Sequence, residues 1–598
     1  MKIALVQMNS TMGHFDGTRE RVLAHDRAFA RQGAELAVYP STVVTGYDPQ
    51  ALLTEPGFQA DIATMLEQLA NECTVPTLLP FTFELAGEPV FEVAYLSEGS
   101  VVPLRMASIL ASLGSLGTAP VGDAPIQFSL GDVDFGIAFD LTMLDAYASG
   151  SQNADVVIYL PFDGYNTDDE ASAMAHGVGD GFYLKEAAEA NAWLVAVNGV
   201  GAQDQIVFSG SSFVLAPWGE LACVLPAFEE VARVVDVDPL SEGPLRSPLA
   251  PPVYNRTQFL WSALTLATHD FAVKQGMGGV GVLMTGDLMS SAAAALAVDA
   301  LGPTRVHGVV APVLGAKEAA DAKRLAQNLR IQVTEIAGEE LDAAANALGL
   351  TYQAAALSLA RIRANALFRA KGYLSLSGVD KTALAVGQDF DAYASCDFAP
   401  FSDVYRTDLL ALVSNRNLKS PVVPRTVLSR VEVPRNLRLE TRLRSDALIL
   451  SDLDSILLRH VERGETLSEL VRDGCDEMLA QFIVGRYDAS ELVRRSCPVG
   501  PVVSDRSLLE NRLPICCAWH DHVREDVVAS DSSEPAALYG LDELMERFAQ
   551  VTGTAPGAIE PAVGGQTDIP GFLRDFASAG GFSAEGDDVW GSGLFSKN

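Results

Sequence analysis

Five prolines fall within 14 residues near the middle of the chain, and this cluster restricts the fold more than any other feature. They are Pro239, Pro244, Pro248, Pro251 and Pro252. Proline fixes the backbone φ angle and lacks an amide hydrogen, so such a stretch continues neither a helix nor a central strand. The chain has 598 residues, which is more than one hydrophobic core usually organises. We therefore predict a linker at residues 239–253 that joins two folded domains.

Apolar strands alternate with amphipathic helices before this linker. KIALVQM at residues 2–8 and DVVIYLP at residues 155–161 have the composition of buried strands, while residues 17–33 and 184–191 have helical spacing. This alternation predicts a layered α/β domain over residues 1–238.

A second alternation follows the linker. Strands are expected at VGVLM, RVHGVV, IQVTEI and TALAV, with helices beginning at Ser290 and Ala316. Parallel strands joined by right-handed helical crossovers form doubly wound sheets. We predict such a sheet, with a helical C-terminal part, over residues 254–519. An acidic extension is expected over residues 520–598, where the only lysine is Lys597.

Charge and composition exclude several classes of protein. The net charge is -35, from 77 acidic and 42 basic residues, so a nucleic-acid backbone would be repelled. No apolar run is long enough to span a membrane, and the first residues lack the features of a secretory signal. The seven cysteines form no CxxC pair, so neither a metal site nor a disulfide framework is expected. We predict a cytoplasmic protein with no nucleic-acid or membrane partner.

Several segments resemble one family in the same order along the chain. YPSTVVTGYDPQALLTEPGF, VNGVGAQDQIVFSGSSFVL and FAPFSDVYRTDLLALVSNRN are similar to landmarks of glutamine-dependent NAD+ synthetase. The resemblance implies an N-terminal αββα nitrilase-like sandwich that hydrolyses glutamine. It also implies a C-terminal PP-loop (adenine nucleotide α-hydrolase-like) domain that uses ATP to amidate nicotinate adenine dinucleotide.

The residues that the family uses for glutamine hydrolysis are replaced. A glutaminase of this kind needs a thiolate nucleophile, a carboxylate base and a lysine that stabilises the oxyanion. By the resemblance, the base position holds Ser41, the lysine position holds Ala107 and the nucleophile position holds Asp140. We therefore predict that the glutaminase site is absent.

No displaced residue restores this site. The sequence contains no lysine between Lys2 and Lys185. Cys73 and Cys223 are the only cysteines before the linker, and neither ends the expected strand. The loss therefore does not depend on the details of the alignment.

The phosphate loop is also altered. Where the family has SGGxDS between a strand and a helix, this chain has Thr285, Gly286, Asp287, Leu288, Met289 and Ser290. Asp287 adds a side chain and a negative charge where backbone should approach phosphate. Met289 removes the carboxylate of the motif. Thr285, Gly286, Asp287 and Ser290 thus form a vestigial loop.

Further motifs downstream differ in the same way. The segment Val386–Asp391 is expected at the place of the family's TGNKSE, with Asp389 replacing a lysine, and the following segment is too short for a Mg2+ ligand. The loop Pro312–Ala316 has no hydroxyl group. Arg361 and Arg363 persist, either as ligand contacts or as partners in ion pairs between helices.

These observations favour a folded homologue that has lost both chemistries and acts as a partner, scaffold or regulator. No cofactor is then expected. An active NAD+ synthetase, which would need ATP and Mg2+, is one alternative, and a nucleotide-binding module without turnover is another. The expected partner is a second copy or an intact paralogue. A helix at Gly540–Val551 has one apolar face, for packing on its own domain or on a partner.

Overall fold

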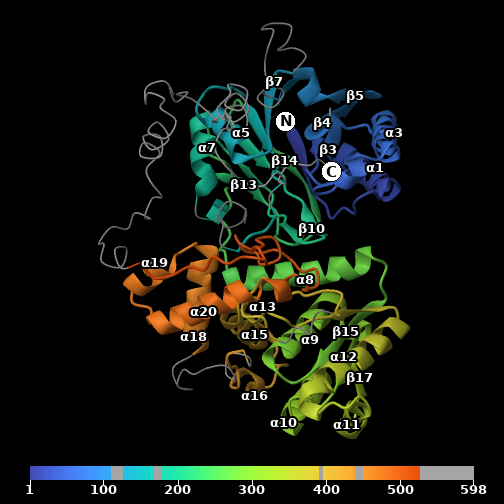
Figure 1. The fold of residues 1–598 in the computed structure, drawn as a ribbon. Coiled ribbons are helices and arrows are strands. Elements are labelled where there is room, and N and C mark those ends of the chain that lie inside the picture. The colour runs from blue at the N-terminus through green and yellow to red at the C-terminus, as the bar shows by residue number, and fades with distance from the viewer. Residues whose placement is uncertain are drawn as a thin grey trace, which may run out of the picture. The chain divides into compact units, whose positions relative to one another are not determined.

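Two six-stranded sheets build the N-terminal half of the chain. The computed structural model describes residues 1–85, 87–108, 126–162, 164–167, 177–179, 181–388, 395–434, 437 and 449–524. The predicted helix at Gly540–Val551 lies outside these residues. Residues 1–524 belong to one compact unit, and Figure 1 shows the arrangement of the helices and strands within it.

The first sheet has the order β14-β1-β2-β3-β4-β5. Its strands are β1 (Lys2–Gln7), β2 (Leu36–Val38), β3 (Thr77–Leu85), β4 (Glu88–Ser97), β5 (Ser100–Pro103) and β14 (Val231–Asp236). β1, β2 and β3 are parallel, and the remaining strands add antiparallel at the edges. Helices α1 (Phe15–Gln32) and α3 (Pro56–Glu72), with the short α2 (Gln50–Leu53) before α3, lie on the side of this sheet away from the second sheet.

The second sheet has the order β13-β12-β9-β8-β7-β6. Its strands are β6 (Ile126–Leu130), β7 (Val133–Ala138), β8 (Val156–Tyr159), β9 (Trp193–Ala196), β12 (Phe213–Leu215) and β13 (Leu221–Val224). Helices α5 (Leu141–Ala148) and α7 (Phe182–Ala190) cover its outer face. The two strands β10 (Val200–Gln203) and β11 (Ile206–Ser209) form a separate hairpin.

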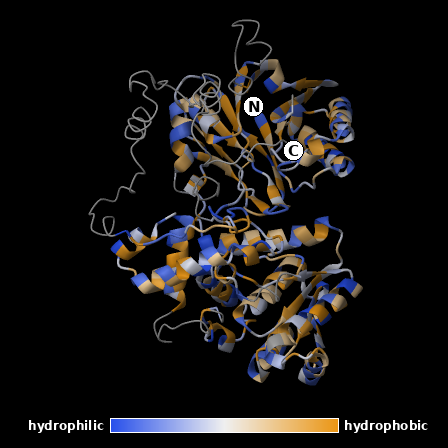
Figure 2. Ribbon diagram, in the orientation of Figure 1, coloured by the Kyte–Doolittle hydropathy of each residue, from blue (hydrophilic) through white to orange (hydrophobic). Residues whose placement is uncertain are grey.

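Apolar side chains of both sheets meet in a shared core. Ile3 and Leu5 of the first sheet pack in the same cluster as Phe135 and Ile158 of the second, and all four are at most 1% exposed. Figure 2 shows this concentration of apolar residues on the strands. The N-terminal half is therefore an αββα sandwich, as the sequence predicts.

A four-stranded parallel sheet organises the C-terminal half, in the order β17-β16-β15-β18. Its strands are β15 (Gly279–Met284), β16 (Val306–Val310), β17 (Gln332–Glu335) and β18 (Tyr373–Leu376). One face packs on α11 (Gly338–Ala347) and α12 (Tyr352–Ala370). The other packs on α8 (Arg256–Lys274), α9 (Leu288–Leu301) and α10 (Ala316–Leu329). Helices on both faces make this a doubly wound sheet.

Short helices complete the described part of the chain. They are α13 (Lys381–Ala385), α15 (Arg406–Lys419), α16 (Arg425–Leu428), α18 (Leu450–Leu457), the π-helix η2 (Leu458–Glu462), α19 (Leu467–Arg472), α20 (Glu477–Ala489) and α21 (Glu491–Arg494); the 3-10 turn η1 (Pro303–Arg305) precedes β16. In the described residues no helix is long and apolar enough to cross a membrane.

Two element predictions are wrong. TALAV is the helix α13 and not a strand, because Asp380 caps it by accepting a hydrogen bond from the Ala383 amide at 2.8 Å. The edge strand is β18 instead. The helix α9 begins at Leu288, two residues before Ser290, because Asp287 is its N-cap.

Helix α8 joins the two halves of the unit. Between β14 and α8, residues 237–255 form no helix and no named strand. Asp270 of α8 is 2% exposed and accepts hydrogen bonds from Asn9 Nδ2 and the Ala202 amide, both at 2.8 Å. Lys274 donates from Nζ to the carbonyl oxygens of Ser10 and Ala202, at 2.9 and 2.7 Å. A polar cluster thus connects α8 with the first residues after β1 and with β10.

Candidate functional sites

Ser41 lies just after β2, where the first sheet approaches the second. Its side chain is buried and its hydroxyl donates to the carbonyl oxygen of Leu160 at 2.6 Å. The Leu160 amide donates to the Ala138 carbonyl at 2.8 Å, which places Ser41 near the end of β7. The Ser41 hydroxyl therefore forms a hydrogen-bonded contact between the two sheets.

Asp140 follows β7 and is exposed. It is the N-cap of α5, and its Oδ1 accepts a hydrogen bond from the Met143 amide at 2.7 Å. A carboxylate in this role satisfies one of the amides at the start of a helix. The sequence predicted its place after the strand but not this role.

The third predicted position, Ala107, is exposed and follows β5. Two residues earlier, Arg105 lies within electrostatic reach of both Glu92 and Asp140, and its pKa is lowered by burial. Asp140, Arg105 and Ser41 therefore gather at the same edge of the sandwich. Among the described residues, Arg105 supplies a positive charge at this edge.

Glu92 is a charged residue of this region that the sequence did not single out. It lies in β4, is 1% exposed, and accepts hydrogen bonds from the amides of Val93, Arg105 and Met106 at 2.8, 2.6 and 2.9 Å. Burial raises the pKa of its carboxyl group. These three bonds hold the turn that follows β5. The only sign of these three hydrogen bonds in the sequence is an acidic residue within an apolar strand.

Three phenylalanine rings also pack at this edge. Phe162 lies 4.0 Å from Phe91 and 5.9 Å from Phe139, measured between ring centroids. Phe139 immediately precedes Asp140. Aromatic rings in this arrangement fill space with apolar surface, so Phe139, the residue before Asp140, is part of an apolar cluster.

The loop between β15 and α9 is held by its own side chains. Ser290 Oγ accepts hydrogen bonds from the amides of Thr285 and Gly286, at 3.1 and 3.3 Å, and from Thr285 Oγ1 at 3.0 Å. Asp287 Oδ1 accepts from the Ser290 amide at 2.8 Å. Three amides of this loop, those of Thr285, Gly286 and Ser290, thus have partners within the loop.

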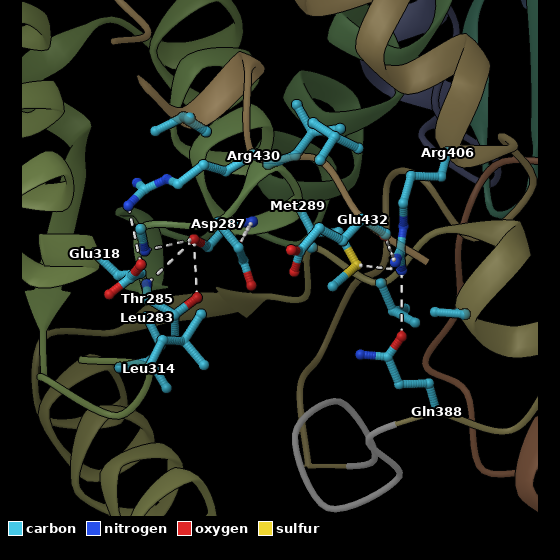
Figure 3. A pocket seen from close by; sticks show the side chains of 18 of the residues that line it. Leu283, Thr285, Asp287, Met289, Leu314, Glu318, Gln388, Arg406, Arg430 and Glu432 are labelled. Carbon is cyan, nitrogen blue, oxygen red and sulfur yellow. Dashed lines mark hydrogen bonds and ion pairs between the residues drawn. The ribbon is translucent and has the colours of Figure 1, made fainter. Parts of the chain in front are cut away.

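A cavity of about 280 Å³ opens at the carboxyl ends of β15 and β18 (Figure 3). The vestigial loop lines one side, and Ser377 to Val379, which follow β18, line another. Ligands of doubly wound folds bind at this edge of the sheet. Gly378 approaches α9 so closely that a Cβ there would lie 2.5 Å from the Met289 carbonyl oxygen.

Two arginines of the cavity are engaged in ion pairs. Arg406 donates from Nε to Asp380 Oδ2 at 2.7 Å and from Nη2 to Asp380 Oδ1 at 3.2 Å. Nη2 also contacts Met289 Sδ at 3.2 Å and Gln388 Oε1 at 3.4 Å, as Figure 3 shows. Arg430 pairs with Glu318 at 2.9 Å.

The two predicted arginines of α12 differ. Arg361 is 6% exposed and lines the cavity, whereas Arg363 is exposed and does not belong to its lining. Nε and Nη1 of Arg361 are buried without a hydrogen-bond partner among the described residues. The structure therefore brings Arg361 together with Thr285, Gly286, Asp287 and Ser290, and leaves Arg363 outside.

The other downstream motifs fall in different places. Val386 follows α13 and Gln388 lines the cavity, whereas Asp389 and Asp391 lie outside the described residues. The segment that directly follows β18 is Ser377–Asp380. The predicted segment Val386–Asp391 therefore begins further along the chain, after α13. In the loop Pro312–Ala316, Leu314 lines the cavity.

Lys381 is a buried charge that the sequence did not predict. It is fully buried, and its Nζ pairs with Asp403 at 2.8 Å and with Glu462 of η2. It also donates to Ser504 Oγ at 2.7 Å and to the Arg506 carbonyl at 2.9 Å. Lys381 therefore connects α13 with the C-terminal segment and does not line the cavity.

Asp454 holds the starts of two helices. It accepts hydrogen bonds from Thr382 Oγ1 at 2.6 Å and from the Thr407 amide at 2.8 Å. Burial raises the pKa of Asp454 to about 6. Among the described residues, no group of three or more His, Cys, Asp and Glu side chains is placed to hold a metal ion.

Two sequence profiles match the chain. The carbon-nitrogen hydrolase family matches residues 2–246, and the NAD synthase family matches residues 260–497. Together they cover both halves described above, in the predicted order.

Curated proteins match along most of the chain. The glutamine-dependent NAD(+) synthetase of Aquifex aeolicus is 27% identical over 578 residues, which are 86% of this chain and 99% of that protein. The enzyme of the same name from Synechocystis sp. is 28% identical over 562 residues, 87% of this chain and 99% of that protein.

Solved structures share the fold. A glutamine-dependent NAD+ synthetase from Acinetobacter baumannii in complex with adenosine diphosphate has a TM-score of 0.61 at 21% identity, covering 89% of this chain and 99% of that one. A glutamine-dependent NAD(+) synthetase from Cytophaga hutchinsonii has a TM-score of 0.64 at 13% identity, covering 87% and 98%. With a nitrilase-like sandwich, an NAD synthase sheet and relatives that match at both ends, the chain belongs to the glutamine-dependent NAD+ synthetase family.

Proposed function

We propose that this chain is a non-catalytic member of its family and acts as a partner, scaffold or regulator, with itself or with an intact paralogue. One observation carries the proposal: at both sites, side chains at the motif positions are hydrogen-bonded to the chain's own backbone. Ser41 donates to Leu160, Asp140 caps α5, and Asp287 caps α9 by accepting from the Ser290 amide. The cytoplasmic location predicted from the sequence is part of this proposal.

At the positions that the resemblance implies, the described part of the glutaminase half has Ser41, Ala107 and Asp140 in place of the carboxylate base, the lysine and the thiolate. A serine hydroxyl that donates to a buried carbonyl is no base near neutral pH. An exposed aspartate would form an anhydride with the substrate acyl group, and the base needed to activate water is missing. The buried Glu92 is occupied by three amide hydrogen bonds. These features support a sandwich without hydrolytic activity.

The synthetase half does not fit ATP with Mg2+. ATP sites of this type present free amides to the phosphates, but the amides of Thr285 and Gly286 donate to Ser290 Oγ. Asp287 adds a negative charge beside them, and Met289 offers no oxygen to a metal ion. No reaction step is therefore assigned to ATP or Mg2+.

The cavity itself supports binding without turnover. It has a volume of about 280 Å³ and is lined by both apolar and charged side chains, which is the character of ligand pockets. A ligand bound in this cavity would regulate the chain without being converted to a product.

A second candidate is an active NAD+ synthetase that uses glutamine or ammonia with ATP and Mg2+. It is favoured by the full-length similarity to curated enzymes of that name, which covers 99% of the relative from Aquifex aeolicus. This candidate requires that unlike residues have rebuilt both sites.

An activity assay separates the two candidates. The purified chain is incubated with ATP, Mg2+ and nicotinate adenine dinucleotide, with glutamine in one arm and ammonium in the other, and glutamate and NAD+ are measured. We expect neither product above a buffer blank. NAD+ formation with ammonium would establish an active synthetase half, and glutamate release would establish an active glutaminase half.

A further inference from the structure

Arg361 is a buried cation that forms no ion pair with the described residues. Its Nε and Nη1 have no hydrogen-bond partner among the described residues, although the residue is only 6% exposed. The neighbouring thiol of Cys396 does not neutralise it, because burial raises the pKa of that thiol and keeps it protonated near neutral pH. A buried guanidinium without an anion is unfavourable, so its presence in a cavity indicates a ligand that supplies one.

The other arginines of the cavity are not available to such a ligand. Arg406 is held by both oxygens of Asp380, and Arg430 is held by Glu318 and Asp321. The orphaned nitrogen atoms therefore belong to Arg361 alone among the three arginines that line the cavity.

Charge and size restrict the ligand further. The lining contains three arginines and three acids, namely Arg361, Arg406, Arg430, Asp287, Glu318 and Glu432, so a polyanion gains no net attraction. The cavity of about 280 Å³ is at the lower end of the range for ligand pockets, about 300–1,000 Å³. The amides of Thr285 and Gly286 in the phosphate loop donate to Ser290 Oγ.

We propose that the cavity holds a small molecule with one compact anionic group, a carboxylate or a phosphate monoester, bound by the guanidinium of Arg361, and that this ligand is not a nucleoside triphosphate. A planar guanidinium binds two oxygens of either group side by side. The inference rests on the proposed function, in which the cavity binds without turnover.

Thermal unfolding of the full chain tests the inference. Acetate and inorganic phosphate serve as the two compact anions, ATP as the polyanion, and chloride at matched ionic strength as the reference. A ligand that binds only the folded state raises the melting temperature. At about 10 mM, we expect acetate or phosphate to raise it by about 2 °C or more, and ATP to raise it less. The larger of the two shifts assigns the anionic group.

Arg361→Gln is the test variant, and Arg363→Gln, on the exposed side of the same helix, is the matched control. We expect Arg361→Gln to abolish the shift and Arg363→Gln to retain it. Since the change removes an unpaired buried charge, Arg361→Gln should melt no lower than the parent without anion; if it fails to fold, Arg361→Lys keeps the charge and should retain a reduced shift.

Three results would overturn the inference: no shift with either anion, an undiminished shift in Arg361→Gln, or a larger shift with ATP than with both anions. None of them depends on NAD+ or glutamate formation. The activity assay can therefore fail or succeed separately from this binding test.

Discussion

Asp140 and Asp287 have the same role in two different sheets. Each follows a strand, and each carboxylate accepts an amide hydrogen bond from the helix that comes next, at 2.7 and 2.8 Å. A capping aspartate is worth about 1 kcal/mol of stability. At the residue scale, Asp140 and Asp287, which do not fit the family's motifs, are therefore explained by their role as helix caps.

Replacing Asp140 by alanine tests this reason. We expect Asp140→Ala to lower the free energy of unfolding by about 1 kcal/mol in urea titrations, because the Met143 amide loses its partner. Asp140→Asn, which can still cap, should lose less. Glutamate release from glutamine should stay at the level of the blank in all three proteins. Release by the parent chain that disappears in Asp140→Ala would show that Asp140 is catalytic.

Asp454 gives the fold a dependence on pH. Burial raises the pKa of Asp454 from 3.8 to about 6, so the folded state binds this proton more tightly than the unfolded state. The contribution of Asp454 to stability is then full below about pH 4 and is lost as the pH rises through 6. We expect Asp454→Asn to reduce the fall in unfolding free energy between about pH 5 and pH 8, measured by urea titration.

The control for this prediction is Asp452→Asn, an exposed residue in the first turn of the same helix. It should leave the pH dependence of the parent unchanged. Equal slopes in the parent and in Asp454→Asn would contradict the role given to Asp454.

At the scale of elements, sequence patterns predicted the layers but not every boundary. Apolar runs predicted a layered α/β domain and a doubly wound sheet, and both predictions are confirmed. The αββα arrangement of the first half was implied by the family resemblance. The prediction for TALAV failed because a short continuous apolar run, here Ala383–Val386, fits a buried strand and a buried helix equally well. Asp380 decides between them by capping the helix.

The hydrogen bonds of the two sites could not be predicted from the sequence, for a different reason. Ser41 bonds to Leu160, which lies 119 positions away in the chain, and Lys381 pairs with Glu462, 81 positions away. Such partners are set by tertiary packing. The differences from the family's motifs could be predicted from the sequence, whereas the hydrogen bonds of Ser41, Asp140 and Asp287, and the unpaired nitrogen atoms of Arg361, could not.

Gly286 shows what the phosphate loop still requires. Its φ is +86°, and a Cβ there would lie 2.0 Å from the Glu318 carbonyl oxygen. Gly33, which ends α1, has a φ of +70° but open space around it. We expect Gly33→Ala to lower the free energy of unfolding by about 1 kcal/mol, the strain of a left-handed backbone alone, and Gly286→Ala to lower it by more. Equal losses in denaturant titrations would show that the loop yields to the added methyl group.

At the scale of the whole molecule, we expect an oligomer, formed with itself or with an intact paralogue, in which the nitrilase-like half supplies the main contact. The sandwich has an intact core, whereas Ser41, Ala107 and Asp140 differ from what the resemblance implies, and an interface depends on surface shape and not on those residues. Light scattering at low micromolar concentration should give a mass well above that of a single chain. A mass near 63.5 kDa, with and without the paralogue, would contradict this prediction.

The contacts of helix α8 restrict how the gene for such a chain can be divided. Its buried Asp270 and Lys274 find their partners at Asn9, Ser10 and Ala202, and its apolar residues pack with Val207 of β11. A gene split at the proline-rich segment would leave Asp270 and Lys274 of one product without their partners, and would leave both donors and acceptors uncovered on the other. Two separately encoded halves would therefore need new partners for these buried groups.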